Sequence, residues 1–262
     1  MRILRFNQHN PDGTPTDDFF QEHLGRATAS SAGAIMDFTQ KGAEGSTRRL
    51  YRLLKVAEIL SGIAVSDHYV SMAMRAGTAA EPKARFDYEI EEGVMVDQVG
   101  MVVADDERFA WSPDGLCGDN GAIEIKGPQT TTHLQTLDAG DIPDENLPQL
   151  WFAFMVHPGL DWIDWISRDG GMSKKPENFG AILPRRFVQF SVRLERKDCL
   201  EQIAKMKAAA EKFMDDVQAT VDRISSKVPE LPEPLASVLD DPELSICDAD
   251  IAWSQRGFTK EP

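Results

Sequence analysis

The sequence of 262 residues is poor in cysteine and has no long apolar run. No stretch approaches the ~20 consecutive apolar residues that a membrane-spanning helix needs, so we expect no membrane segment and no membrane partner. Residues 1–7 are too few and too quickly polar for a signal peptide. The cysteines, Cys117, Cys199 and Cys247, are odd in number and far apart. This usage indicates a reducing, cytoplasmic compartment and offers no zinc-binding spacing.

Positive charge is also scarce. The chain has 28 Lys and Arg against 43 Asp and Glu, a formal net charge of -15 and a pI near 4.7. Affinity for duplex DNA is largely phosphate neutralisation, so this composition alone argues against a nucleic-acid binder. A DNA-binding function requires that acid gathers on an outer surface and in a metal site, while the DNA path keeps its Lys and Arg.

The remaining composition, 42% hydrophobic and 27% charged, is that of an ordinary globular protein. The length suits one large domain. We expect one folded domain over residues 1–226 and an extended tail over residues 227–262, because prolines interrupt the last stretch.

The most informative stretch runs from Ser112 to Lys126. Its first half contains turn residues, ending in Asp119-Asn120-Gly121, and its second half, residues 122–126, alternates as a strand does. Side chains two apart on a strand share a face, so Glu124 and Lys126 should point the same way while Ile123 and Ile125 enter the core.

If the strand ending near Asp114 pairs with the strand carrying Glu124, two carboxylates and Lys126 converge. Mg²⁺ favours one or two carboxylates, with water and substrate phosphate as its other ligands. A lysine beside such a cation is suited to activate the attacking water, since cationic neighbours and partial burial lower its pKa. This set predicts metal-assisted hydrolysis of a phosphodiester. An EF-hand interpretation of residues 114–121 fails on spacing.

These residues carry a specific resemblance. Pro113-Asp114 followed by Glu124-Ile125-Lys126 looks like the PD-(D/E)XK nuclease signature. Ser112-Pro113-Asp114-Gly115-Leu116 followed by Glu124-x-Lys126 resembles the phage lambda exonuclease family of viral recombination alkaline exonucleases. An acid-x-lysine pair alone is common on solvated edge strands, so the longer match and the segments on both sides carry the resemblance, which covers residues 24–194.

The resemblance implies an α/β fold with a PD-(D/E)XK restriction-endonuclease-like core. This core would be a mixed sheet of about five strands flanked by helices, with a helical N-terminal region and a long C-terminal helix. It further implies an exonuclease that requires Mg²⁺ or Mn²⁺, digests linear double-stranded DNA from a 5′ end to mononucleotides, and leaves a 3′ single strand for recombination by annealing. A homotrimer ring, a single-strand annealing protein as partner, and a phage or prophage origin in the cytoplasm of a bacterial host are implied in the same way.

The resemblance also assigns roles in the reaction. Asp114 and Glu124 would hold the metal, helped by the backbone carbonyl of Ile125. Lys126 would stabilise or deprotonate the water that attacks the phosphate.

Three further residues enter through neighbouring segments. Glu81 lies just before Pro82 on a helix expected over residues 67–91, and matches a family glutamate that faces the metal site. Gln149 matches a glutamine beside the catalytic lysine. Met74 aligns with an apolar wedge that contacts the end of the duplex, although a core methionine explains it equally well.

The resemblance places a pocket for the terminal 5′-phosphate near residues 23–30. Ser30 and Ser112 match phosphate-holding serines, although a hydroxyl at a helix start also serves as an ordinary cap. The family arginine falls at His23 in this sequence, so either His23 or the displaced Arg26 must supply the charge.

The other elements follow from periodicity. We expect an irregular lead-in over residues 1–18, a basic loop over 38–49 that either contacts DNA or is solvated, and a long basic loop over the cleft at 168–186. Expected strands are 94–99, 107–111, 161–166 and 187–194, and expected helices are 50–62, 130–137, 148–156 and 197–226.

Two other functions remain open. A restriction-type or structure-specific DNA endonuclease would use the same core. A non-catalytic acidic interaction protein would keep the fold without the chemistry, but the complete set of Asp114, Glu124 and Lys126 argues against it.

Overall fold

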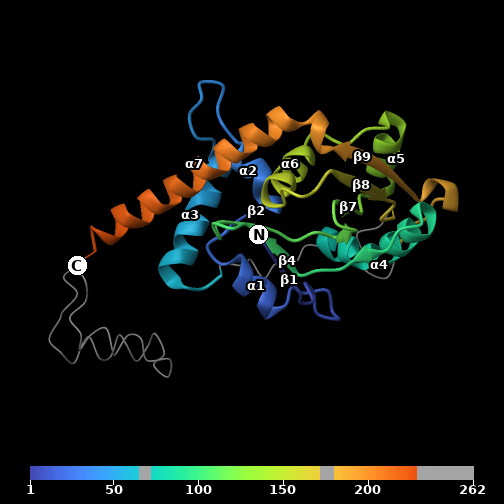
Figure 1. Ribbon diagram of the computed structural model, residues 1–262, viewed down its shortest axis with the longest axis horizontal. Helices are drawn as coiled ribbons and strands as arrows, with labels where there is room; N and C mark the ends of the chain where they lie inside the picture. Colours follow the sequence, from blue (N-terminus) through green and yellow to red (C-terminus); the bar gives the residue numbers. More distant parts are fainter. Residues whose placement is uncertain (65–71, 172–179, 229–262) are drawn as a thin grey trace. The chain divides into compact units, whose positions relative to one another are not determined.

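The structure, a computed structural model, describes residues 1–64, 72–171 and 180–228, without the side chains of residues 72–79 (Figure 1). Residues 1–221 form one compact unit, which is the one described below. No helix within the described ranges is long and apolar enough to cross a membrane. The predicted tail lies almost entirely outside these ranges, so the division at residue 226 stays a prediction.

The central sheet has five strands in the order β3-β6-β7-β8-β9. Only β7 and β8 run parallel, and the other neighbours are antiparallel. The predicted α/β class with a mixed five-stranded sheet is confirmed. The strands are β3 (Val96–Asp97), β6 (Gly115–Cys117), β7 (Gly121–Lys126), β8 (Trp162–Arg168) and β9 (Gln189–Glu195).

A second sheet of four short strands was not predicted. Its order is β1-β4-β5-β2, with β1 (Arg2–Leu4), β2 (Ala27–Thr28), β4 (Met101–Val103) and β5 (Phe109–Trp111). The expectation of an irregular lead-in is therefore wrong for Arg2–Leu4, which pairs with β4. Strands of two or three residues are too short to show a period of two in the sequence.

The helices agree with the predicted ones to within a few residues where both exist. They are α1 (Asp17–His23), α2 (Ala32–Ile35), α3 (Ser46–Ser61), α4 (Met72–Glu92), α5 (Thr130–Ala139), α6 (Leu147–Val156) and α7 (Leu200–Ser225), with short 3-10 turns η1 (Ala29–Ser31), η3 (Arg185–Phe187) and η4 (Arg196–Asp198). Gly62, with φ +66°, ends α3 as expected for a left-handed cap.

Strand β7 lies in the middle of the central sheet and has the predicted alternation. Ile123 and Ile125 are buried and pack with Ala84 and Tyr88 of α4. Glu124 faces the other way and is nevertheless only 3% exposed. A carboxylate buried to that extent needs hydrogen-bond or charge partners. Its position on β7 therefore indicates a functional site at this strand.

The predicted strand pairing around Asp114 is wrong in detail. The strand that ends before it, β5, belongs to the second sheet, and Asp114 instead precedes β6. Strand β6 pairs antiparallel with β7, with Gly115 opposite Ile123, and the same register puts Asp114 opposite Glu124. The two acids therefore converge through a different pair of strands.

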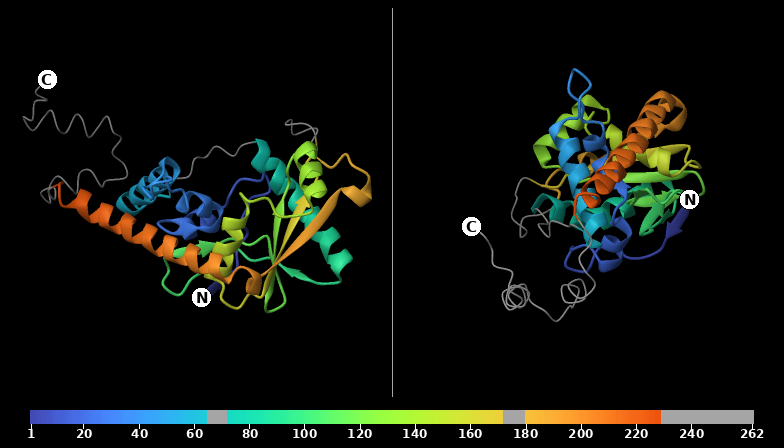
Figure 2. Two further views of the ribbon diagram at one scale, coloured as in Figure 1. Left: turned by 90° about the horizontal axis from the view of Figure 1, so that it is seen from above. Right: turned by 90° about the vertical axis from the view of Figure 1, so that its left-hand side faces the viewer.

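Helix α4 is held against the sheet by buried polar contacts at its C-terminal half (Figure 2). The Tyr88 hydroxyl donates to Asp164 of β8 at 2.6 Å, and the same carboxylate accepts Arg193 of β9 at 2.7 Å. Asp87 accepts Arg168 at 2.8 Å. These contacts fix the direction of the N-terminal half of α4.

Some of the scarce basic residues are used inside the fold. Arg48 was predicted in a basic loop, but it lies in α3, is 2% exposed, and pairs with Glu44 and with Asp216 of α7. Tyr51 of α3 stacks on Phe213 of α7 beside it, where the two helices cross (Figure 1). Arg168 is likewise a buried residue of β8, not part of a loop. Residues 172–179 of that predicted loop lie outside the described ranges.

The packing at the end of β7 generates a prediction about Gly170. Its N–H donates to the Pro128 carbonyl, and an added Cβ would lie 2.7 Å from the Gly127 oxygen and 2.8 Å from the Pro128 oxygen. Backbone oxygens cannot rotate away, so Gly170→Ala should lower the free energy of unfolding by about 1–3 kcal/mol, measured by urea denaturation.

Gly33→Ala is the matched control. Gly33 lies in α2 and nothing is within 4 Å of the added Cβ. This variant should be neutral or stabilised by roughly 0.5–1 kcal/mol. Equal stability of the two variants would contradict the tight approach of residues 127–128 to Gly170.

Candidate active site

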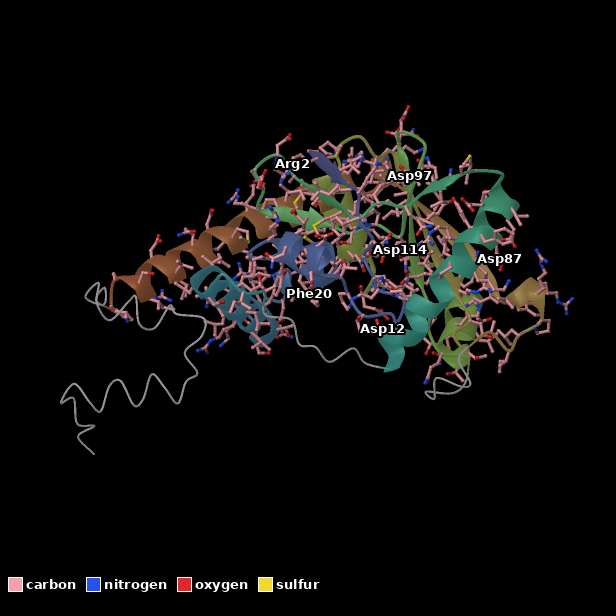
Figure 3. The ribbon with its side chains drawn as sticks, turned by 90° about the horizontal axis from the view of Figure 1, so that it is seen from below. Arg2, Asp12, Phe20, Asp87, Asp97 and Asp114 are labelled. Carbon is pink, nitrogen blue, oxygen red and sulfur yellow. The ribbon has the colours of Figure 1, made fainter. Side chains whose placement is uncertain are left out.

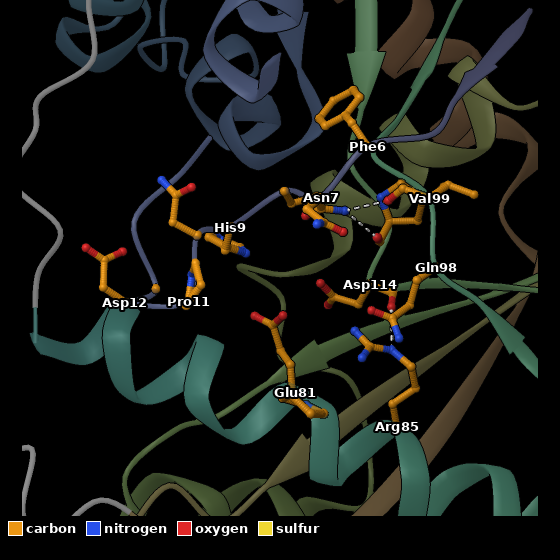
Figure 4. A pocket seen from close by; sticks show the side chains of 15 residues that line it. Phe6, Asn7, His9, Pro11, Asp12, Glu81, Arg85, Gln98, Val99 and Asp114 are labelled. Atoms are coloured by element: carbon orange, nitrogen blue, oxygen red, sulfur yellow. Dashed lines mark hydrogen bonds between the residues drawn. The ribbon is translucent and has the colours of Figure 1, made fainter. Parts of the chain in front are cut away.

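Three carboxylates from three parts of the fold gather beside the central strand β7. Asp114 comes from the residue before β6, Glu124 from β7 and Glu81 from α4. Figure 4 shows Glu81 and Asp114 directed into the same space, and Figure 3 shows Asp114 between the N-terminal segment and α4.

The proximity of the three acids is visible in their pKa values. Burial, and then the charges of Glu124 and Glu81, raise the pKa of Asp114 well above its usual range. Burial also raises the pKa of Glu81, with Arg85 opposing and Glu124 adding to the effect. The site therefore holds more negative charge than its own cations neutralise.

Glu124, Lys126 and Gln149 form a closed hydrogen-bonded triad. The Lys126 ammonium donates to Glu124 Oε1 at 2.7 Å and to Gln149 Oε1 at 2.9 Å. Gln149, from α6, donates from Nε2 to the same Glu124 oxygen at 2.6 Å. The other oxygen, Glu124 Oε2, is buried and has no hydrogen-bond partner within the described part of the chain. Such an orphan acceptor needs an explanation, and a bound cation supplies one.

The expectation of a lowered pKa for Lys126 is wrong for the protein alone. Burial lowers the pKa, but the charges of Glu124 and Asp114 outweigh it, and the pKa of Lys126 is raised. The carboxylates thus keep this side chain as an ammonium. A bound divalent cation would oppose that effect.

Asp114 is held at its carboxylate by a backbone N–H and at its carbonyl by an arginine side chain. Its Oδ2 accepts the N–H of Ile125 at 2.5 Å, and its own carbonyl accepts Arg85 Nε at 3.0 Å. The carboxylate is therefore fixed beside the peptide of Ile125, whose carbonyl was predicted as a metal ligand.

The donor set fits a hard divalent cation. Among the residues that the structure describes, no three His, Cys, Asp or Glu side chains gather closely enough to form a complete cage for a metal. Mg²⁺ and Mn²⁺ do not require one, since one or two carboxylates with water and phosphate suffice. Asp114 and the orphan oxygen of Glu124 meet this requirement.

A small cavity of about 150 Å³ joins this site to the predicted phosphate pocket. It is lined by Asp114, Glu124 and Gln149 and also by His23, Ser30 and Ser112. The Ser112 hydroxyl is buried and has no partner in the described ranges, so it is available to a ligand. Residues that the sequence separates by more than 80 positions thus share one cavity wall.

The structure does not give this pocket the expected positive charge. His23 donates from Nδ1 to the Phe19 carbonyl, and burial lowers the pKa of His23 to about 4, so its imidazole is neutral at pH 7. Arg26 is held by Glu22 and Glu107 and does not line the cavity. Thr28 precedes η1 but makes no side-chain cap.

Sequence reasoning missed the contribution of the N-terminal segment. Residues 6–13 line a larger cavity of about 480 Å³ together with Glu81, Arg85 and Asp114 (Figure 4). Gln8 ties the segment down by donating to the carbonyls of Val99 and Pro113. The Asn10-Pro11-Asp12-Gly13 sequence signals a tight turn, but nothing in it shows where the turn docks.

Met74 lies on α4, but its side chain falls outside the described part. The predicted wedge against the duplex therefore stays a prediction.

Comparisons with known proteins agree on one family. The YqaJ-like viral recombinase domain matches residues 18–157. Two structures of LHK-Exo, an alkaline exonuclease from Laribacter hongkongensis, one of them in complex with dAMP, are 31% identical to this chain with a TM-score of 0.68. Each match covers 81% of this chain and 97% of LHK-Exo.

A phage-related exonuclease from Haemophilus somnus has a TM-score of 0.54 at 13% identity, with 74% of this chain and 96% of that chain covered, and it supports the fold alone. No protein of curated function matches.

The cluster of acids predicts stabilisation by divalent cations. Mg²⁺ or Mn²⁺ should raise the melting temperature, since a ligand at 100 times its Kd adds about 2.7 kcal/mol to stability. Glu124→Gln removes a ligand, so this variant should lose most of the shift in a thermal melt.

Asp97→Asn is the matched control, because Asp97 is an exposed acid that pairs with Arg5. It should keep the full shift. An undiminished shift in Glu124→Gln would place the cation elsewhere.

Proposed function

This chain belongs to the YqaJ-like viral recombinase family, and from that premise we propose that it is a metal-dependent exonuclease that digests linear double-stranded DNA from 5′ ends. The observation that carries the proposal is the convergence of Asp114, Glu124 and Gln149 on one cavity, with Lys126 hydrogen-bonded to both Glu124 and Gln149. LHK-Exo, described as an alkaline exonuclease and solved with a mononucleotide, supports the release of mononucleotides.

The side chains have distinct roles in this proposal. Asp114, Glu124 and the carbonyl of Ile125 would hold Mg²⁺ or Mn²⁺, which supplies charge stabilisation at the phosphate and a more acidic water. Gln149 and Lys126 fix Glu124 by hydrogen bonds to one oxygen and leave the other directed at the site.

Lys126 acts as a charged donor to the attacking water or to a phosphate oxygen, because the neighbouring acids keep it protonated. Glu81 orients water at the same site. Burial raises the pKa of Glu81, and the charge of Glu124 adds to this effect, so a cation bound nearby would favour its ionised form.

The 5′-phosphate would be registered by neutral donors. Ser112 offers an unpartnered hydroxyl and Ser30 a hydroxyl 3.3 Å from that of Thr28. His23 lines the same wall but donates its one ring proton to the Phe19 carbonyl, so it shapes the pocket and offers the phosphate no donor. A pocket of this kind selects a phosphate by shape and hydrogen bonds, and leaves little charge to attract internal phosphates.

The assembly and setting are proposed from the resemblance to the phage lambda exonuclease family. A homotrimer ring around the duplex, a single-strand annealing protein as partner, and recombination in the cytoplasm of a phage-infected or prophage-carrying bacterium fit an exonuclease that leaves 3′ single strands.

The function is tested by comparing linear with closed circular duplex DNA in the presence of Mg²⁺. Linear DNA should yield acid-soluble nucleotides, whereas the closed circle should stay intact. Nicking or linearisation of the circle would instead identify an endonuclease, and no release from either would leave a non-catalytic protein.

Lys126→Ala should lower the rate by about 10²–10⁴-fold while DNA ends are still bound. Lys205→Ala, an exposed lysine of α7, should cleave as the wild type does.

Ser112 generates a separate prediction about end recognition. Ser112→Ala should reduce the preference for 5′-phosphate over 5′-hydroxyl ends by roughly 10-fold or more, since a hydrogen bond to a charged group contributes about 1.5–3 kcal/mol. The hydroxyl has no partner within the described residues, so its removal should leave the fold intact. The measurement is the ratio of initial rates on the two substrates.

Ser61→Ala, at the exposed end of α3, is the control and should leave the ratio unchanged. An unchanged ratio in Ser112→Ala would show that Ser112 does not bind the 5′-phosphate.

A further inference from the structure

The two cavities at the site share three lining residues. Asp114, Gln8 and His9 line both the small cavity and the larger one. The small cavity carries the proposed 5′-phosphate pocket. The larger one is lined by residues 6–13 and by Glu81, Pro82 and Arg85 of α4, and these three residues of α4 do not line the small cavity (Figure 4). Its volume of about 480 Å³ lies in the range of small-molecule sites, which is about 300–1,000 Å³.

Arg85 is the one Lys or Arg in the described lining of the two cavities. It lies one turn after Glu81 on α4, so the two side chains share a helix face. Figure 4 shows its guanidinium directed towards Asp114 within the larger cavity. The chain has a net charge of -15, which repels phosphate in general. The part of the cavity wall beside this single cation is therefore where a phosphate can be bound.

The hydrogen bonds of Arg85 leave most of the guanidinium unused. Its Nε donates to the Asp114 carbonyl at 3.0 Å, while its two terminal nitrogens have no hydrogen-bond partner or ion pair in the described ranges. Glu81 is near enough for its charge to interact with Arg85, but the two form no ion pair there.

Other buried arginines differ in this respect. Arg48 pairs with Glu44 and Asp216, and Arg168 pairs with Asp87. Arg85 is also largely buried, at 9% exposure, but has no such carboxylate within the described residues. A buried cation is costly unless it is paired, so an unpaired one with its fork towards a cavity is arranged for an anion that arrives with the substrate.

We propose that Arg85 binds a backbone phosphate of the degraded DNA strand, on the side of Asp114 that faces the larger cavity. The inference rests on the proposed function and adds to it the direction of the strand, from the small cavity across Asp114 into the larger one. The guanidinium fork holds two phosphate oxygens, while Nε keeps the Asp114 backbone in place. Substrate binding and the position of a proposed metal ligand are thereby linked through one side chain.

The test measures affinity for a 5′-phosphorylated duplex end between 50 and 200 mM NaCl in Mg²⁺, with Lys126→Ala in every protein to prevent cleavage. Adding Arg85→Gln should lower affinity about tenfold or more and reduce the slope of log K against log salt by about 0.9, the value of one phosphate contact. A purely structural role would leave the slope unchanged.

Lys83→Gln is the matched control. Lys83 lies on the same helix, carries the same charge, is 69% exposed at its side chain and lines neither cavity. Its slope should equal that of the parent. An unchanged slope in Arg85→Gln, or an equal reduction in both variants, would overturn the proposal.

Arg85→Lys decides the matter if Arg85→Gln does not fold. It keeps the charge but loses the fork and the Nε bond, so the slope should persist while affinity falls several-fold. Parental affinity in Arg85→Lys would also overturn the proposal. Wild-type protein in the same buffer separates the two proposals. If it releases nucleotides and the Arg85→Gln slope is unchanged, only the proposal for Arg85 is refuted. If it releases none, the proposed nuclease function is refuted.

Discussion

The whole site depends on burying Glu124 in the middle of a sheet. A carboxylate 3% exposed is tolerable only if its negative charge is compensated, and Lys126, two residues along the same strand, does this from the same face. Gln149 closes the triad from α6, so the sheet and a helix are joined at the point where the chemistry is proposed. Asp114 and Glu81 add two further carboxylates, and one ammonium cannot neutralise the charge of all three acids. A divalent cation bound beside them would supply the missing positive charge.

The distribution of positive charge accounts for how so acidic a chain can act on DNA. Arginines such as Arg48, Arg168 and Arg193 form ion pairs that join a helix to a helix, a helix to the sheet, or two strands of the sheet. Their charge contributes to the fold and little to the surface potential. Recognition of DNA in this proposal depends on a few donors inside the cavities, on Ser112 and Arg85 in particular, in agreement with binding confined to ends.

The sequence was informative where a pattern is local. The alternation of residues 122–126 predicted which side chains of β7 enter the core, and the apolar periods predicted α3, α6 and α7 closely. It failed where the outcome depends on distant partners. The register of Arg2–Leu4 with β4, the pairing of β6 and not β5 with β7, and the burial of Arg48 all follow from tertiary contacts that no window of the sequence contains. The same holds for Arg85, whose significance arises only when its helix meets residues 6–13.

The anchoring of the N-terminal segment has a consequence for biosynthesis. Gln8 is translated 105 positions before one of its acceptors, the carbonyl of Pro113. The wall that Gln8 supports therefore cannot form until Pro113 has been made, and Glu124 and Gln149 emerge later still. A nascent or truncated polypeptide that ends before Gln149 lacks the hydrogen-bonded triad, so under the proposed function hydrolysis becomes possible only after these distant residues have folded together.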